Sequence, residues 1–315
     1  MQRIALIATL VVVAFRPLSG QRESGAALWR LAATTFPLPP ALALGGAASF
    51  WNPAQPDGAA RAVLGLDAIQ TPAAIGAAGI LAAARLSIGR LGRFGVVYGR
   101  MEIADLVHTT QTPDPDGASI PFFTAVTGAT WSRDYGATTL GATLAHHDSR
   151  LDARQDERWT LDLGVHHAFG DRLRLAAATH GFSNLSFKDP AQDVYAGAEL
   201  RFWRGLLWNG ADTATLVARY GVAVAHQFTA DQYFGLGLAV GEGFSADVSI
   251  SKEGSYGTPG WRPAAGVAVA IGKYQGGQIV VTDKAYSWEG VKVADLGLDK
   301  LQPIDVPADA LTPPP

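Results

Sequence analysis

Two histidine pairs are the first residues whose types and spacing suggest chemistry. His146-His147 and His166-His167 fall on neighbouring predicted strands, with Asp148 and Asp162 as candidate carboxylate partners. Imidazole and carboxylate groups bind metal ions and transfer protons in acid–base catalysis. Adjacent residues of a strand point to opposite faces, so only one histidine of each pair can enter a common site. Nothing else at ligand spacing supports the pairs, and we expect no metal site.

A serine nucleophile is the second possible chemistry. Ser183 and Ser186 lie near His180, but neither is part of a Gly-x-Ser-x-Gly elbow. The glycines at 235, 237 and 241 lack dinucleotide-binding spacing, and the sequence has no Walker-type phosphate loop. We therefore expect no catalytic residue and no cofactor, and we expect that the protein is not an enzyme.

Composition narrows the function classes further. The chain has 315 residues, a net charge of −3, 17% charged residues, 36 glycines and no cysteine. It is neither a disordered tail nor a basic nucleic-acid binder, so we expect no nucleic-acid partner. Without disulfides, an exported chain must be stabilised by packing or by a closed hydrogen-bonded sheet.

The first twenty residues predict a secretory signal peptide. Arg3 gives a positive start, residues 4–15 form an apolar core, and Leu18-Ser19-Gly20 ends it with small residues. Cleavage is expected after Gly20. The alternative is a retained membrane anchor, but a spanning helix needs about 20 apolar residues.

Beyond the signal, the dominant pattern is the period-two alternation of β-strands with one apolar face. Between Trp159 and His167, every second residue is large and apolar, whereas the residues between them are polar or small. No later apolar run reaches the length of a spanning helix. About twelve strands of ~10 residues are predicted, near residues 60–70, 74–87, 93–105, 120–132, 135–147, 157–169, 172–184, 192–204, 213–227, 232–241, 243–252 and 261–274. Residues 278–283 and 41–50 are candidates for further strands, which gives twelve to fourteen.

The connections between these strands roughly alternate in length. Long polar loops are expected at 108–119, 148–156, 184–191 and 252–260, and short turns near 134, 170–171 and 241–243. Outer-membrane barrels have short periplasmic turns and long external loops, so this parity places both chain ends in the periplasm. The connections at 205–212 and 229–231 break the alternation.

The predicted fold class is therefore an all-β transmembrane antiparallel barrel of about twelve to fourteen strands, located in the bacterial outer membrane. Hydrocarbon offers no partner to unpaired backbone groups, so a β-structure can span it only when its edges close. The expected organisation is a signal peptide over 1–20, an N-terminal periplasmic or plug segment over 21–59, a barrel over 60–275 and a periplasmic tail over 276–315, with room for one more strand there. A soluble β-sandwich is the competing fold.

Charged residues on the predicted inward faces are candidates to line a polar lumen. Alternatively, they only pair with one another and fill the barrel interior. They are Asp162, Arg172, Arg174, Asp193, Glu199, Arg201, Arg219 and Asp247.

The segment Gly45-Gly46-Ala47-Ala48-Ser49-Phe50-Trp51-Asn52-Pro53-Ala54 resembles the N-terminal segment of the FadL-like and PorV-like outer-membrane proteins. The resemblance implies a barrel of about fourteen strands and a segment at or inside the barrel mouth. Phe50, Trp51, Asn52 and Pro53 are then the expected plug or gate, although a chain end that only packs is equally compatible. The Pro-rich tail ending at Pro315 departs from the family pattern.

Two functions follow from this resemblance. The first is a channel or transporter for small solutes, hydrophobic ones among them. The second is a non-transporting barrel that serves as a partner in protein secretion or surface attachment. Outer-membrane lipid is an expected partner in both cases, together with a solute in the first and a secreted or periplasmic protein in the second.

Overall fold

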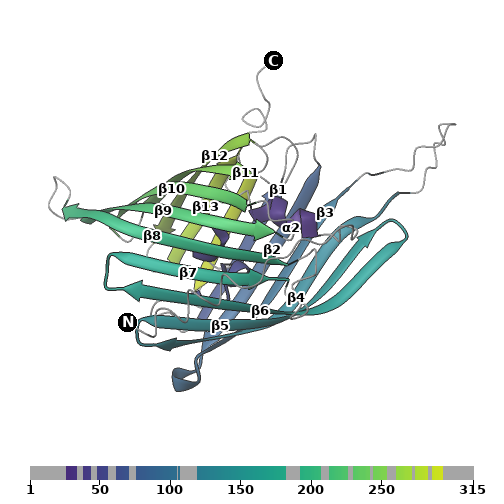
Figure 1. The fold of residues 1–315 in the computed structure, drawn as a ribbon, viewed down its shortest axis with the longest axis horizontal. Helices are drawn as coiled ribbons and strands as arrows, with labels where there is room; N and C mark the ends of the chain where they lie inside the picture. The colour runs from purple at the N-terminus through teal and green to yellow at the C-terminus, as the bar shows by residue number, and fades with distance from the viewer. Residues whose placement is uncertain are drawn as a thin grey trace, which may run out of the picture.

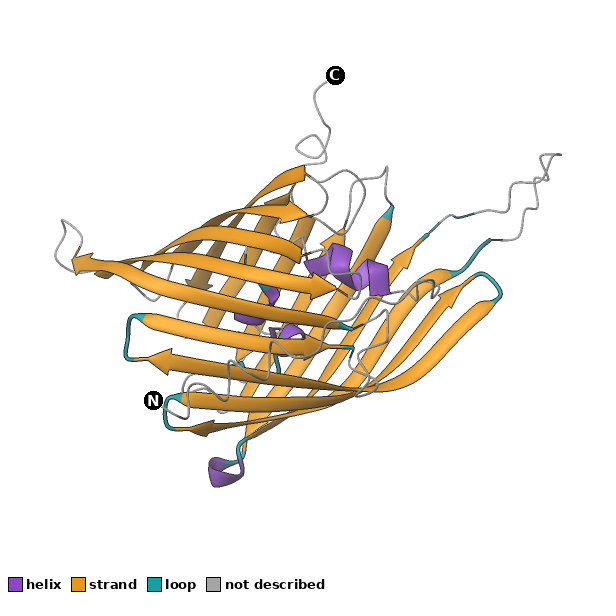
Figure 2. Cartoon of the chain, in the orientation of Figure 1, coloured by secondary structure: helices purple, strands orange, loops and turns teal. Residues whose placement is uncertain are grey.

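A computed structural model of the chain contains a closed antiparallel barrel of fourteen strands. Figure 1 shows the tilted strands, and Figure 2 shows short helices within the ring that the strands form and one helical turn at its lower end, outside the ring. The structure describes residues 26–33, 38–43, 48–55, 62–70, 76–104, 106, 119–181, 192–206, 213–225, 230–241, 244–253, 260–271, 274–282 and 286–293.

The described strands follow one another around the barrel in sequence order. They are β1 (Ala62–Gln70), β2 (Ala77–Ser87), β3 (Arg93–Ile103), β4 (Phe122–Tyr135), β5 (Thr138–Leu151), β6 (Arg154–Phe169), β7 (Leu173–His180), β8 (Asp193–Leu206), β9 (Thr213–Ala225), β10 (Ala230–Val240), β11 (Phe244–Glu253), β12 (Gly260–Ile271), β13 (Tyr274–Thr282) and β14 (Tyr286–Val293). β14 pairs with β1, from Val63 opposite Val293 to Gln70 opposite Tyr286, and this pairing closes the sheet.

The short helices are α2 (Ala26–Ala33), η1 (Pro40–Leu42), α3 (Ala48–Trp51) and η2 (Gly89–Leu91). The first three belong to the N-terminal segment, and η2 lies in the connection between β2 and β3. In the part of the chain that the structure describes, no helix is long and apolar enough to cross a membrane.

The outer face of the barrel is apolar, because large hydrophobic side chains point away from the sheet. Leu161 and Leu163 of β6 are 45% and 47% exposed, whereas Asp162 between them is 3% exposed. The same alternation runs around the wall, with Leu64, Val96, Leu144, Leu200, Leu236 and Val248 among the exposed residues. A closed sheet with an apolar exterior and a polar interior is an architecture that spans an outer membrane. The predicted fold class and location are confirmed.

The strand count falls at the upper end of the predicted range, but two boundaries differ from the expectation. β13 and β14 occupy residues assigned to the C-terminal tail, so the predicted barrel end at 275 is too early. The described residues within 41–50 form no strand; they belong to η1, α3 and the residue that follows η1. Pro39 and Pro40 lack backbone donors, and a closed barrel offers this segment no free sheet edge to pair with.

The predicted long loop at 148–156 is also wrong. β5 continues to Leu151 and β6 begins at Arg154, so only a tight turn with Asp152 at a φ of 56° separates them. These strand ends are polar on both faces, which conceals the alternation used to find strands. The signal peptide, residues 294–315 and most of the other predicted long loops lie outside the described residues.

The closed sheet predicts a characteristic behaviour on denaturing gels. Folded outer-membrane barrels resist detergent because every strand is paired on both sides. We expect unboiled protein from the outer-membrane fraction to migrate faster than boiled protein. A soluble protein with a single band position under both conditions would contradict the membrane-spanning barrel.

Candidate functional site

The N-terminal segment packs against the inner wall of the barrel, and Asn52 holds it in a compact shape. The Asn52 side-chain amide donates a hydrogen bond to the Ala41 carbonyl at 2.8 Å. Its Oδ1 accepts a hydrogen bond from the Ala54 backbone amide at 2.9 Å. One buried side chain therefore ties α3 to the η1 turn eleven residues earlier. Pro53, which has no backbone donor, needs no further partner at this bend.

The wall carries glycines where the segment touches it. A Cβ atom on Gly141 would lie 2.3 Å from the Pro53 carbonyl carbon, and one on Gly221 would lie 2.3 Å from Pro39 Cβ. Gly99, Gly164 and Gly197 stand similarly close to other residues of the segment. These five wall glycines come from β3, β5, β6, β8 and β9. Because they lack side chains, the segment can approach the sheet backbone closely.

The predicted plug residues are all buried. Phe50 is 3% exposed, Trp51 2% and Asn52 1%, and Pro53 is buried as well. The Phe50 ring lies 4.8 Å from that of Trp29 in α2 and 4.9 Å from that of His180 in β7. The segment and the wall thus share one aromatic cluster.

Four of the predicted lumen-lining residues form a charge ladder along the inner wall. Arg174 Nε donates to Glu199 Oε1 at 2.9 Å, and Arg219 Nε donates to Glu199 Oε2 at 2.7 Å. Arg219 also pairs with Asp247. This last contact crosses β10 at Gly237, where an added Cβ would lie 2.5 Å from both charged groups. Opposite charges alternate along the ladder, so each carboxylate is neutralised within the wall.

The other four predicted lumen residues lie apart from the charge ladder. Asp162 and Asp193 are each 3% exposed on the inner wall. Asp162 Oδ1 accepts a hydrogen bond from the Gly181 amide at 2.8 Å. Arg201 is partly exposed beside a β-bulge. Arg172 lies in the exposed turn between β6 and β7, because β7 begins only at Leu173.

The histidine pairs separate between the two faces as strand geometry requires. His147 and His166 are buried on the inner wall, at 4% and 7% exposure. His146 instead packs beside Trp159, and His167 beside Phe169. Among the described residues, no group of three or more histidine, cysteine, aspartate or glutamate side chains is placed to hold a metal ion.

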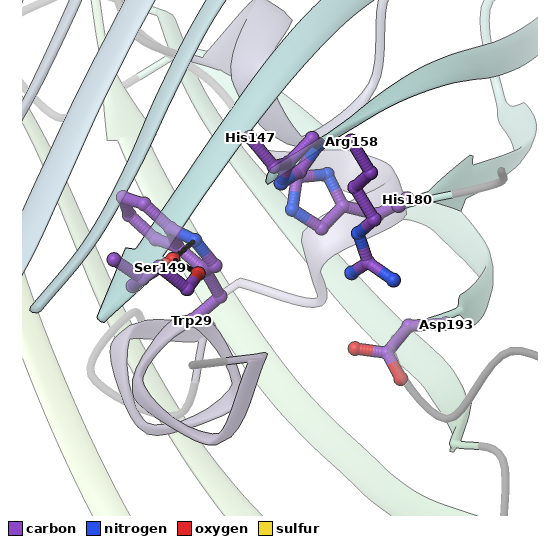
Figure 3. Close-up of a pocket in the computed structure, with 8 residues that line it drawn as sticks. Trp29, His147, Ser149, Arg158, His180 and Asp193 are labelled. Carbon is purple, nitrogen blue, oxygen red and sulfur yellow. Dashed lines mark hydrogen bonds between the residues drawn. The ribbon is translucent and has the colours of Figure 1, made fainter. Parts of the chain in front are cut away.

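Sequence reasoning missed a small pocket between the segment and the wall (Figure 3). It is lined by Trp29, Thr124, His147, Ser149, Arg158, His180, Gly181 and Asp193. Trp29 Nε1 donates to Thr124 Oγ1 at 3.0 Å, and the Thr124 and Ser149 hydroxyls are 2.8 Å apart. These residues come from one helix and five strands or strand ends, so no local sequence pattern predicts that they form a pocket.

Comparisons with known proteins find similarity in fold only. No protein-family model matches the chain, and no curated protein matches it in sequence. Among solved structures, the Pseudomonas putida toluene transporter TodX matches with 11% identity and a TM-score of 0.45, over 78% of this chain and 92% of TodX. The Acinetobacter baumannii outer-membrane protein Omp33 matches with 8% identity and a TM-score of 0.42, over 74% of this chain and 97% of Omp33. A mutant of the Rh. blastica porin matches with 11% identity and a TM-score of 0.35, over 73% of this chain and 97% of the porin.

Proposed function

We propose that this protein is an outer-membrane channel for small hydrophobic solutes, in which the N-terminal segment occludes the lumen and must shift for a solute to pass. The observation that carries the proposal is the fit between the segment and the five wall glycines. The segment contacts wall glycines on five strands between β3 and β9, so it lies across a wide part of the inner wall.

The inner wall carries both hydrogen-bonding and apolar side chains. Thr130, Thr143 and Asp162 are among its buried hydrogen-bonding groups, and water can solvate such groups in an open lumen. Phe50 and Trp51 of the segment belong to one hydrophobic cluster with wall residues such as Leu81 and Val97. Displacement of the segment therefore separates apolar surfaces as well, and an apolar solute that takes its place can cover them.

The proposal predicts that crowding the wall under the segment opens the barrel. We expect Gly141→Ala to increase solute entry into proteoliposomes, because the added methyl group would clash with the Pro53 backbone, which no side-chain rotation can relieve. Liposome swelling in isosmotic sugar solutions measures the effect.

Gly235→Ala is the matched control. The corresponding Cβ at Gly235 has its nearest neighbours at 3.5 Å or more, which is ordinary contact. Both variants must first show the gel shift of a folded barrel. If Gly141→Ala and Gly235→Ala swell at the same rate as the unmodified protein, the segment does not control the lumen, and the non-transporting barrel becomes the better account.

A further inference from the structure

The pocket between the segment and the wall contains a histidine with one unused ring nitrogen. The His180 side chain is 4% exposed; its Nδ1 faces the Asp162 carboxylate, whereas its Nε2 makes no hydrogen bond to any described residue. Buried polar groups are nearly always hydrogen-bonded, so a histidine in this state calls for an explanation. A bound group that the structure does not contain would supply the missing partner.

Asp162 determines which ring nitrogen of His180 carries the proton. His180 Nδ1 lies 3.3 Å from Asp162 Oδ2. In the neutral imidazole, the proton is favoured on the nitrogen that faces the carboxylate, because the carboxylate accepts and cannot donate. Nε2 is then left as a lone-pair acceptor. The group that fits it must therefore carry a donor hydrogen.

The pocket is the size of a single polar group. Its enclosed space holds about one water-sized group. The surrounding groups are the hydroxyls of Thr124 and Ser149, the Arg158 guanidinium and the Asp193 carboxylate, and Figure 3 shows the last two pointing toward one another. A hydroxyl group matches this lining, because it donates to one neighbour and accepts from another.

The immediate surroundings of His180 are aromatic. The rings of Phe50, Trp51 and Tyr195 lie 4.9, 5.7 and 6.4 Å from the imidazole, and Trp29 lines the pocket itself. Aromatic walls favour an apolar, flat frame next to the hydrogen-bonding group. The pocket borders both the segment and the strand ends where β7 finishes and β8 begins, so a solute that displaces the segment passes beside it.

We infer that this pocket recognises the hydroxyl group of a small aromatic or apolar solute, with His180 Nε2 as the hydrogen-bond acceptor. The inference rests on the proposed channel, since it names the chemical class of solute that reaches the segment. It also specifies what the site rejects. A hydrocarbon offers no donor, an ether only accepts, and an ionised carboxylate carries no hydrogen to donate.

The test compares binding of phenol, anisole and benzoate to the purified full-length barrel in detergent by isothermal titration calorimetry. Phenol and anisole share a ring and an oxygen atom, but only phenol donates. We expect phenol to bind with at least about tenfold higher affinity than anisole, which corresponds to the loss of one buried hydrogen bond. Benzoate should bind no better than anisole.

Two variants and one control assign the effect to His180. His180→Phe keeps a ring against Phe50 and Trp51 and should reduce phenol affinity to the anisole level. Ser149→Ala, a smaller change, should weaken phenol binding without altering the ring cluster. His166→Phe makes the same substitution at another buried inward histidine that does not line the pocket, and phenol affinity should stay unchanged.

Each outcome has a distinct meaning. Equal affinities for phenol and anisole, or phenol binding that survives His180→Phe, would leave the pocket as a site for an ordered water only and overturn the inference. Tighter benzoate binding would indicate an anion site at Arg158 and would also overturn it. Selective phenol binding in a protein that passes no solute in liposomes would retain the inference and reject the channel. Phenol flux without selective binding would reject the inference and retain the channel.

Discussion

A disulfide that joins η1 to β8, introduced by the paired substitutions Ala41→Cys and Gly197→Cys, is expected to lower solute flux to the level of protein-free liposomes. A Cβ on Gly197 would lie 3.6 Å from Ala41 Cβ, within the range of about 3.5–4.5 Å found in disulfides. The bond would prevent the segment from leaving the wall. Liposome swelling measured before and after reduction with dithiothreitol tests this, and reduction should restore flux.

The chain suits this experiment because it contains no natural cysteine. Each single-cysteine variant, treated with the same oxidant, controls for damage and for crowding at Gly197, where the flexible Leu42 side chain must shift. Crosslinking itself is verified by a gel shift. Undiminished flux through a fully crosslinked barrel would show that solutes pass beside a fixed segment, and gating by displacement would then be wrong.

The barrel wall was largely predictable from the sequence, because strand alternation is a local property. In β6, the inward Asp162 and the outward Leu161 and Leu163 follow directly from a period of two. The last strand was harder to see. β14 is defined by its pairing with β1, which lies more than 200 residues earlier in the sequence, and no local sequence pattern predicts closure of this kind.

The interior was much less predictable, for a physical reason that α2 illustrates. It has eight residues, too few for a stable isolated helix, and it is helical within the barrel, where Trp29 is 2% exposed. The role of the wall glycines likewise could not be predicted from the sequence, because it follows from their contact with the segment. The Asn-Pro motif drew attention to residues 50–53, but nothing in the sequence connected His180 to them.

The charge ladder predicts a large loss of stability when its central residue is removed. We expect Arg219→Met to lower the free energy of unfolding by about 3 kcal/mol, because it leaves the buried Asp247 carboxylate without its cation. The Arg219 side chain is 8% exposed, Glu199 5% and Asp247 8%. Asp247 loses its ion pair with Arg219 in this variant, whereas Glu199 keeps Arg174. Urea unfolding in lipid vesicles, followed by tryptophan fluorescence, measures the change.

Arg100→Met provides the matched control, because it makes the same substitution in an exposed pair. Arg100 Nη2 lies 2.9 Å from Glu102 Oε2, and the two side chains are 41% and 48% exposed. Solvent screening should hold that loss below about 1 kcal/mol. The double variant Arg219→Met with Asp247→Asn should recover part of the stability, since it removes the carboxylate that the single variant strands. Equal, small losses of stability in both single variants would mean that water reaches the charge ladder freely. The wall charges would then be lumen groups available to a solute. They would not be buried pairs that hold β7, β8, β9 and β11 together.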